Sequence, residues 1–358
     1  MSDRFHTLTI ADIRRETADA ISVRFDVPDA LRGQFAFKAG QHLTLRTRME
    51  GQEIRRNYSL CVSPLEGELR VTIKRIHGGA FSNWANDTLA AGQKIEVMQP
   101  HGSFVWPFAA NAVNRYVGFA GGSGITPVMS LLKTALRSEP LSRFTLLYGN
   151  RDSSSIIFLE ELAALKNAFL DRLEVFHFLS DEEDEIELFN GMLDREKCDL
   201  LLSELIDPAQ VSAFFICGPG PMMDAAEAAL AAKGVDPARI HIERFTAGAV
   251  TAAQAQSAAR LEKQAAGLKV TVSLDGRRHN IEFDAALGNI LDSARASGLP
   301  APFACKGGVC ATCRAKVVSG EVEMKRNFGL TPEEVAQGYV LTCQAVPLGE
   351  GVVIDYEA

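Results

Sequence analysis

Four cysteines near the C-terminal end of the chain have the types and spacing needed to bind a metal centre. Cys305, Cys310 and Cys313 follow the pattern C-x4-C-x2-C, and Cys343 lies further along the chain. Two irons with bridging sulfides require four convergent thiolates, and this spacing is typical of the ligands of a 2Fe–2S cluster. A structural zinc site is the alternative, although zinc usually takes its cysteines from two CxxC pairs, and the last cysteine here stands alone. The sequence therefore predicts a 2Fe–2S centre on a loop.

A glycine-rich segment in the middle of the chain could hold a phosphate group. The segment Gly121-Gly122-Ser123-Gly124-Ile125-Thr126-Pro127 lies between an apolar strand pattern and a helical pattern. Glycines let the backbone approach a phosphate closely, and the following helix would offer N–H groups and a positive dipole end. We expect Thr126 to cap this helix and Pro127 to occupy its first turn. The spacing differs from the G-x-G-x-x-G fingerprint, and a plain strand-to-helix turn is the alternative.

Two shorter motifs could contact a cofactor. Arg56-Asn57-Tyr58-Ser59 offers a cation for phosphate, an aromatic ring for stacking and a hydroxyl for hydrogen bonding. The alternative is that the tyrosine belongs to a hydrophobic core. Cys217-Gly218-Pro219 ends a strand pattern, and ligands bind at the carboxyl ends of strands in open α/β sheets.

The elements that must position these motifs fall into distinct regions. The first hundred residues read as all-β, because short apolar and β-branched runs alternate with Gly, Pro and Asn as in a small barrel. Strand and helix patterns then alternate, which predicts a parallel sheet with right-handed crossovers. The strands expected in this sheet are 116–120, 144–148, 173–178, 213–217 and 240–243, and the expected helices are 127–136, 156–168 and 222–233.

The remaining chain reads as a linker and a third domain. Residues 246–268 are rich in Ala and Gln and poor in large apolar residues, so we interpret them as a partly helical linker, with a core helix as the alternative. Residues 269–274 and 280–283 alternate around the turn signal Asp275-Gly276, which predicts a hairpin. A helix near 289–296 precedes the cysteine loop.

Composition limits the compartment and the partners. The chain has 358 residues and a formal net charge of −8, which argues against nucleic acid or an anionic membrane as a partner. We find no apolar run of membrane-spanning length and no signal-peptide core at the N-terminus. Cys61, Cys198 and Cys217 are scattered and odd in number, which favours reduced thiols and a cytoplasmic location.

Taken together, these motifs carry a family resemblance. The Arg56-x-Tyr58-Ser59 motif, the glycine-rich segment and Cys217-Gly218-Pro219 occur in the order found in the ferredoxin–NADP reductase family, which residues 5–245 resemble. The cysteine region resembles plant-type ferredoxins over 269–358. The resemblance implies an FAD-binding antiparallel β-barrel at 1–110, an α/β parallel-sheet NAD(P)-binding domain at 111–245, a linker at 246–268 and a β-grasp 2Fe–2S domain at 269–358.

The resemblance also implies roles for individual residues. Ser59 would lie near the flavin N5, Cys217 near the nicotinamide C4, and Glu243 near the flavin, which makes these three the candidate catalytic residues. The other residues expected to contact FAD or the nicotinamide nucleotide are Arg56, Tyr58, Ile73, Lys74, Phe81, Ser82, Gly122, Gly124, Thr126, Gly218, Pro219 and Phe245. The order of domains resembles the electron-transfer components of bacterial oxygenases.

The function implied is electron transfer from NAD(P)H through FAD and a 2Fe–2S cluster to the oxygenase component of a multicomponent monooxygenase. The alternatives are a stand-alone reductase of small acceptors and a non-enzymatic zinc- or cluster-binding adaptor. Arg151 and nearby serines follow the strand at 144–148, where such domains read the adenine ribose, and an Arg with hydroxyls there suits the 2′-phosphate of NADPH. Asp152 is the feature that would favour NADH, and a solvated loop arginine is the alternative interpretation of Arg151.

Overall fold

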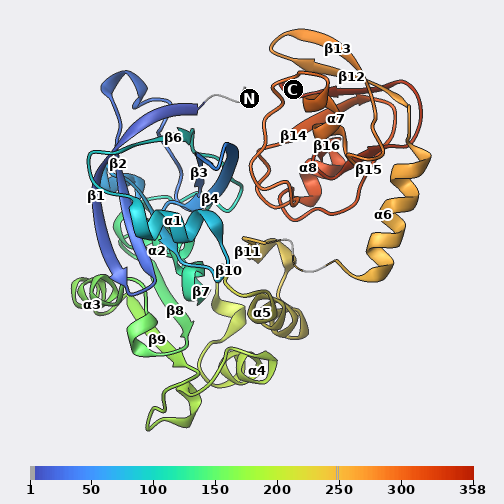
Figure 1. Ribbon diagram of the computed structural model, residues 1–358. Helices are drawn as coiled ribbons and strands as arrows, with labels where there is room; N and C mark the ends of the chain where they lie inside the picture. The colour runs from blue at the N-terminus through green and yellow to red at the C-terminus, as the bar shows by residue number, and fades with distance from the viewer. Residues whose placement is uncertain (1–4, 247, 249) are drawn as a thin grey trace.

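The computed structural model describes residues 5–246, 248 and 250–358. Within these residues the chain forms an antiparallel sheet, a parallel sheet and a mixed sheet, in that order along the sequence (Figure 1). The three-part organisation therefore agrees with the fold class expected from the motifs. No helix in the described part of the chain is both long and apolar enough to span a bilayer.

The first sheet is a barrel with strand order β4-β3-β6-β1-β2-β5. A bridge between Leu60 and Val71 joins the end of β4 to β5 and closes it. Alternate residues of each strand point inward, which gathers Leu8, Leu43 and Val97 into a fully buried core. The strands are β1 (Phe5–Thr17), β2 (Ala20–Asp26), β3 (His42–Met49), β4 (Gln52–Ser59), β5 (Leu69–Lys74) and β6 (Lys94–Met98).

The all-β expectation for the first hundred residues is wrong at one element, the helix α1 (Ala80–Thr88). It is short and follows two glycines, so its pattern resembles a loop in the sequence. The helix forms because Phe81 and Ala85 are buried against the barrel core, which is tertiary packing that local propensity does not register.

The second sheet is parallel, with order β11-β10-β7-β8-β9. Helices α2 and α3 share one hydrophobic core and α4 and α5 another, so both faces of the sheet are covered. Helix α4 was not expected from the sequence. The elements are β7 (Arg115–Gly121), α2 (Ile125–Ser138), β8 (Arg143–Asn150), α3 (Leu159–Ala168), β9 (Leu173–Leu179), α4 (Arg195–Glu204), β10 (Ala213–Cys217), α5 (Gly220–Ala232) and β11 (Ile240–Glu243).

The C-terminal sheet has the order β13-β12-β18-β14-β16, beside the smaller pair β15-β17. The expected hairpin is present, because β12 and β13 pair around Asp275-Gly276, and Asn289 caps the expected helix α7. The elements are β12 (Lys269–Leu274), β13 (Arg277–Glu282), α7 (Ile290–Ala296), β14 (Arg314–Ser319), β15 (Val322–Met324), α8 (Pro332–Ala336), β16 (Tyr339–Leu341), β17 (Ala345–Pro347) and β18 (Val352–Asp355).

The segment between the second and third sheets contains the helix α6 (Ala252–Gln264), which has no buried residue. Its C-terminal turn is attached to the third domain, since Leu261 packs against that core and Glu262 pairs with Lys325 at 2.6 Å. Figure 1 shows α6 on the outer side of the C-terminal domain, whose opposite side faces the barrel.

Candidate functional site

The Arg56-Asn57-Tyr58-Ser59 motif lies within β4, at its C-terminal end. The Tyr58 ring is 5.6 Å from the Phe81 ring of α1, and burial raises the pKa of the tyrosine. Ser59 is buried, and its Oγ has no hydrogen-bond partner among the described residues. A buried hydroxyl without a partner is unfavourable, so this atom fits a polar group of a bound molecule, such as the flavin ring.

The N-terminus of α1 lies beside this motif through the Phe81 contact and has no side-chain cap. Its first N–H groups are therefore available to an anion. The Ser82 hydroxyl is already used in the preceding turn, where it accepts from the Ile76 N–H at 3.1 Å. Ile73 is fully buried, and its carbonyl accepts from Asn86, so the end of β5 is held firmly against α1.

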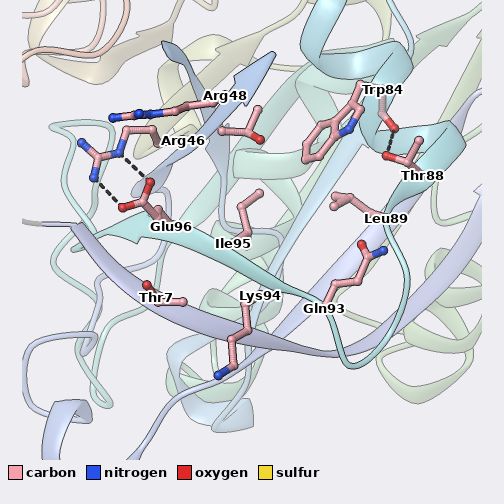
Figure 2. A pocket seen from close by; sticks show the side chains of 11 residues that line it. Thr7, Arg46, Arg48, Trp84, Thr88, Leu89, Gln93, Lys94, Ile95 and Glu96 are labelled. Carbon is pink, nitrogen blue, oxygen red and sulfur yellow. Dashed lines mark hydrogen bonds and ion pairs between the residues drawn. The ribbon is translucent and has the colours of Figure 1, made fainter. Parts of the chain in front are cut away.

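A cavity of about 500 Å³ opens between β3, β6 and the C-terminal half of α1. Figure 2 shows Trp84 at one side of it and Arg48 at the other. Its wall includes Thr47, which pairs with Ile54 on the neighbouring strand β4, two residues before Arg56. Arg46 and Arg48 also line it, so residues from both faces of β3 border the cavity. This cavity had no signal in the sequence.

The glycine-rich turn lies against the end of β10. A Cβ on Gly124 would be 2.0 Å from the Cys217 carbonyl oxygen, and one on Gly121 would be 2.5 Å from Pro219 Cδ. Only glycines allow the two turns to approach this closely. The expected cap at Thr126 is wrong, because α2 begins at Ile125 and the Thr126 hydroxyl donates to the Ser123 carbonyl at 3.0 Å, inside the turn.

The candidate residues of the nucleotide domain lie together at the carboxyl edge of the parallel sheet. Cys217 is the strand partner of Ala120 on one side and of Glu243 on the other. Burial raises the pKa of the Cys217 thiol well above its ordinary value and raises the pKa of Glu243 to about 8. Both groups are therefore neutral at pH 7. Phe245 lies beyond this edge and is 42% exposed.

Two cations lie near the glycine-rich turn. The Lys74 Nζ would be 3.2 Å from a Cβ on Gly122, and burial followed by repulsion from Arg151 lowers the pKa of Lys74. Arg151 is exposed after β8. The neighbouring Asp152 is occupied by its own loop, since it accepts from the Ser154 hydroxyl at 2.6 Å and caps the following turn. This pair of cations suits a phosphorylated ligand.

The four cysteines form two pairs, one within the loop and one between the loop and Cys343, which follows β16. Cys305 interacts with Cys310, and Cys313 with Cys343. Two pairs fit two irons better than one tetrahedral zinc.

The loop backbone is shaped for this arrangement. Lys306, Gly308 and Ala311 have φ values of 54°, 78° and 54°, a left-handed conformation that curls the chain around one point. The Gly307 N–H donates to Cys305 Sγ at 3.3 Å, and Cys310, Cys313 and Cys343 are buried. The loop therefore fits a buried cluster whose sulfurs receive backbone hydrogen bonds.

Comparison with known proteins agrees with this geometry. The oxidoreductase FAD-binding domain matches residues 7–106, the oxidoreductase NAD-binding domain residues 119–228, and the 2Fe-2S iron–sulfur cluster binding domain residues 272–348.

Curated relatives match the whole length of the chain. One subunit of 1,2-phenylacetyl-CoA epoxidase from Escherichia coli (strain K12) is 44% identical, over 99% of this chain and 98% of that protein. The ferredoxin reductase component of 3-ketosteroid-9-alpha-monooxygenase from Rhodococcus rhodochrous is 37% identical, over 98% of this chain and 96% of that protein.

Solved structures show the same fold. Phthalate dioxygenase reductase aligns with a TM-score of 0.58 and 23% identity, over 99% of this chain and 98% of that chain. An intact type IV self-sufficient cytochrome P450 monooxygenase aligns with a TM-score of 0.72 and 22% identity, over 98% of this chain and 41% of that chain. With the site geometry, these matches show that the chain belongs to the family of oxygenase reductases that join FAD, NAD and 2Fe–2S domains.

Proposed function

We propose that this reductase delivers electrons to a phenylacetyl-CoA epoxidase, an oxygenase of phenylacetate degradation. The observation that carries the proposal is the full-length identity of 44% to one subunit of that enzyme, against 37% for the ketosteroid system. The runner-up is a steroid or Rieske-type hydroxylase. The scattered free cysteines support a cytoplasmic location. We also propose the domain boundaries 1–110, 111–245, 246–268 and 269–358 for the three domains and the linker.

The barrel residues would bind FAD in an extended form. Tyr58 would stack on the flavin ring, the unpaired Ser59 hydroxyl would face its N5, and Arg56 with the uncapped N-terminus of α1 would hold the pyrophosphate. Ile73, Lys74, Phe81 and Ser82 complete this wall. The cavity beside Trp84 is bordered by Thr47, the strand partner of Ile54, and has room for the adenosine half of the molecule.

The nicotinamide nucleotide would lie over the edge formed by Gly122, Gly124 and Cys217-Gly218-Pro219, with Thr126, Glu243 and Phe245 near the flavin. FAD supplies the chemistry of accepting a hydride and releasing its electrons singly. The residues of this chain would position FAD and the nicotinamide nucleotide. Burial favours the neutral forms of Cys217 and Glu243, so neither would place a full charge beside the bound nicotinamide.

The electrons balance over two passes. NADPH gives two electrons and one proton as a hydride and leaves as NADP⁺. The four cysteines would hold a 2Fe–2S centre, which carries one electron at a time, so each NADPH would supply two successive one-electron transfers. We propose NADPH as the preferred nucleotide because Arg151 is exposed at the end of β8 while Asp152 is engaged by its own loop.

Reconstitution tests the proposal. The purified protein is mixed with the oxygenase components of phenylacetyl-CoA epoxidase, phenylacetyl-CoA and NADPH, and NADPH consumption is compared with epoxide formed. We expect coupled turnover that is lost when the reductase is omitted. Coupled turnover with a ketosteroid hydroxylase, and none with the epoxidase, would reject the assigned partner and support the runner-up.

A further inference from the structure

Two buried histidines of the barrel lie against each other where the three domains meet. His42 begins β3, and His101 follows β6. Their backbones form an antiparallel bridge, and His42 Nε2 lies 3.0 Å from His101 Nε2. Only 4% of His42 and 6% of His101 is exposed. Two histidines so far apart in sequence gave no motif, and sequence reasoning did not identify them.

This pair reaches residues of both other domains. On one side, His42 Nδ1 lies 3.9 Å from Glu243 Oε1, at the end of β11 in the nucleotide domain. On the other side, His101 Nε2 lies 2.5 Å from the hydroxyl of Thr312, which belongs to the cysteine loop. The Thr312 hydroxyl is in turn 3.2 Å from Cys310 Sγ. A line of polar contacts therefore runs from His42 through His101 and Thr312 to the cluster ligand Cys310, and Glu243 of the nucleotide domain lies near its first member.

The hydrogen bonds have a defined direction. His101 Nδ1 lies 3.1 Å from the Gln99 carbonyl, which can only accept, so this nitrogen carries the proton. Burial lowers the pKa of both histidines, so both are neutral at pH 7. His101 Nε2 then has a single lone pair, which both the Thr312 hydroxyl at 2.5 Å and His42 Nε2 at 3.0 Å approach. The shorter contact assigns the Thr312 hydroxyl as the donor to it. Thr312 has a single hydroxyl proton, so its donation to His101 leaves none for Cys310.

The location of the pair connects it with the proposed flavin site. His42 is the direct strand partner of Ser59 across β3 and β4. Gly102 packs so closely that a Cβ there would be 2.9 Å from His42 Nδ1. The Arg55 guanidinium, which donates to the Phe303 carbonyl at 2.9 Å, makes a further contact between the barrel and the C-terminal domain. The cysteine loop therefore contacts the barrel one strand away from Ser59, the serine proposed to face the flavin.

We propose that His101 and Thr312, with His42 packed against His101, form a latch that holds the cysteine loop on the flavin barrel and keeps the Thr312 proton away from Cys310. The proposal rests on the proposed electron-transfer function and adds positioning residues to it. The latch acts through geometry. The Thr312 hydroxyl of the C-terminal domain faces the His101 acceptor of the barrel, and the two domains are held together here only while both side chains are present.

The test uses paired variants of the holoprotein. His101→Phe removes the acceptor, while His101→Gln offers a replacement oxygen. Thr312→Val removes the donor, while Thr312→Ser keeps it. Stopped-flow absorption follows flavin reduction by NADPH and then cluster reduction. We expect cluster reduction to be about fivefold slower in the Phe and Val variants. The loss of one hydrogen bond should lower the fraction of molecules whose cysteine loop is docked on the barrel by about that factor. Flavin reduction by NADPH should not change.

The reduction potential of the cluster distinguishes the proposed role of the latch from a purely structural effect. In His101→Phe the Thr312 proton becomes available to Cys310, and hydrogen bonds to cluster sulfurs raise the reduction potential. We expect the potential to rise in His101→Phe, to stay near the wild-type value in Thr312→Val, and to return in His101→Gln. Thr271→Val is the matched control, since Thr271 bonds within its own hairpin to Asn280. An unchanged potential and an unchanged rate in His101→Phe would overturn the latch.

Hydrogen exchange gives a readout that needs no electron acceptor. The backbone amides of 97–103 and 305–313 should exchange faster in His101→Phe and Thr312→Val, and should stay protected in Thr271→Val. Equal protection in all the variants would overturn the latch even if the protein proved to have no oxygenase partner. A wild-type protein whose flavin is not reduced by NADPH would instead count against the proposed function, and the exchange experiment would still decide the latch.

Discussion

Gly124 and Cys217 are in direct backbone contact, with no room for a side chain between them. A Cβ on Gly124 would be 2.0 Å from the Cys217 carbonyl oxygen. The glycine-rich turn after β7 and the turn after β10 therefore form one continuous surface at the carboxyl edge of the parallel sheet. This contact explains why the two sequence motifs occur together.

Gly124→Ala should separate the two turns. The added methyl group must displace backbone, and overpacking of this kind costs about 1–3 kcal/mol. We expect a lower Tm and a KM for NADPH raised at least tenfold, measured by thermal unfolding and steady-state kinetics. Gly220→Ala is the control, because a Cβ there would meet nothing within 4 Å. A Gly124→Ala protein with normal KM and Tm would contradict the close contact.

Ser59→Ala should slow hydride transfer without reducing the stability of the fold. The Ser59 hydroxyl is buried and has no partner among the described residues, so its removal should leave apoprotein stability unchanged or raise it by about 1 kcal/mol. Flavin reduction by NADPH should slow about tenfold or more, if this hydroxyl orients the ring. Stopped-flow kinetics and denaturation measure the two effects.

The matched control for this serine is Ser22→Ala. The Ser22 hydroxyl donates to Glu16 at 2.6 Å and accepts from Arg70 at 3.2 Å. Its loss should reduce stability and leave the rate of flavin reduction intact. Equal rates of flavin reduction in the two variants would remove Ser59 from the hydride-transfer site.

Cys343→Ser should remove the 2Fe–2S centre while FAD remains bound, because the barrel and the C-terminal domain have separate hydrophobic cores. Iron, sulfide and flavin contents of the purified variants measure this, and Cys305, Cys310 and Cys313 should behave in the same way. Cys198→Ser is the control, since Cys198 is buried in the nucleotide domain. Full iron and sulfide content in Cys343→Ser would contradict the ligand assignment.

Glu243 should make stability depend on pH. Its pKa in the folded protein is about 8, raised by burial from an ordinary value of 4.5. The folded state therefore holds a proton that the unfolded state has released, and the stability from this group is lost as pH rises from about 4.5 to about 8. The Tm of Glu243→Gln should fall less than that of wild type between pH 6 and pH 9. Parallel curves would show that the carboxyl is already ionised in the fold.

Arg151→Ala should reduce the preference for NADPH. If the guanidinium contacts the 2′-phosphate, its loss should lower kcat/KM for NADPH by about tenfold, as expected for a charge-assisted hydrogen bond, and leave NADH nearly unaffected. Arg143→Ala is a suitable control, because Arg143 is also exposed but lies at the opposite end of β8. An unchanged ratio of the two kcat/KM values would show that Arg151 does not read the phosphate.

The sequence by itself determined the chemistry and the order of the domains. The cysteine spacing, the glycine-rich turn and the Arg56-x-Tyr58-Ser59 motif are local, because each cofactor needs a fixed set of residue types close together in the chain. The strand and helix patterns around these motifs are also local, because they depend on residues that are neighbours in the chain. The hairpin at Asp275-Gly276 could therefore be predicted.

Only the tertiary structure decided what lies between these motifs. Helix α1 forms because the barrel buries Phe81, and Thr126 donates inside the turn because Gly124 already occupies the N-cap position of α2. The contact of His101 with Thr312 joins positions 211 residues apart in the sequence. Such a contact depends on how the three domains pack against one another. A single histidine and a single threonine have no periodicity from which the contact could be predicted.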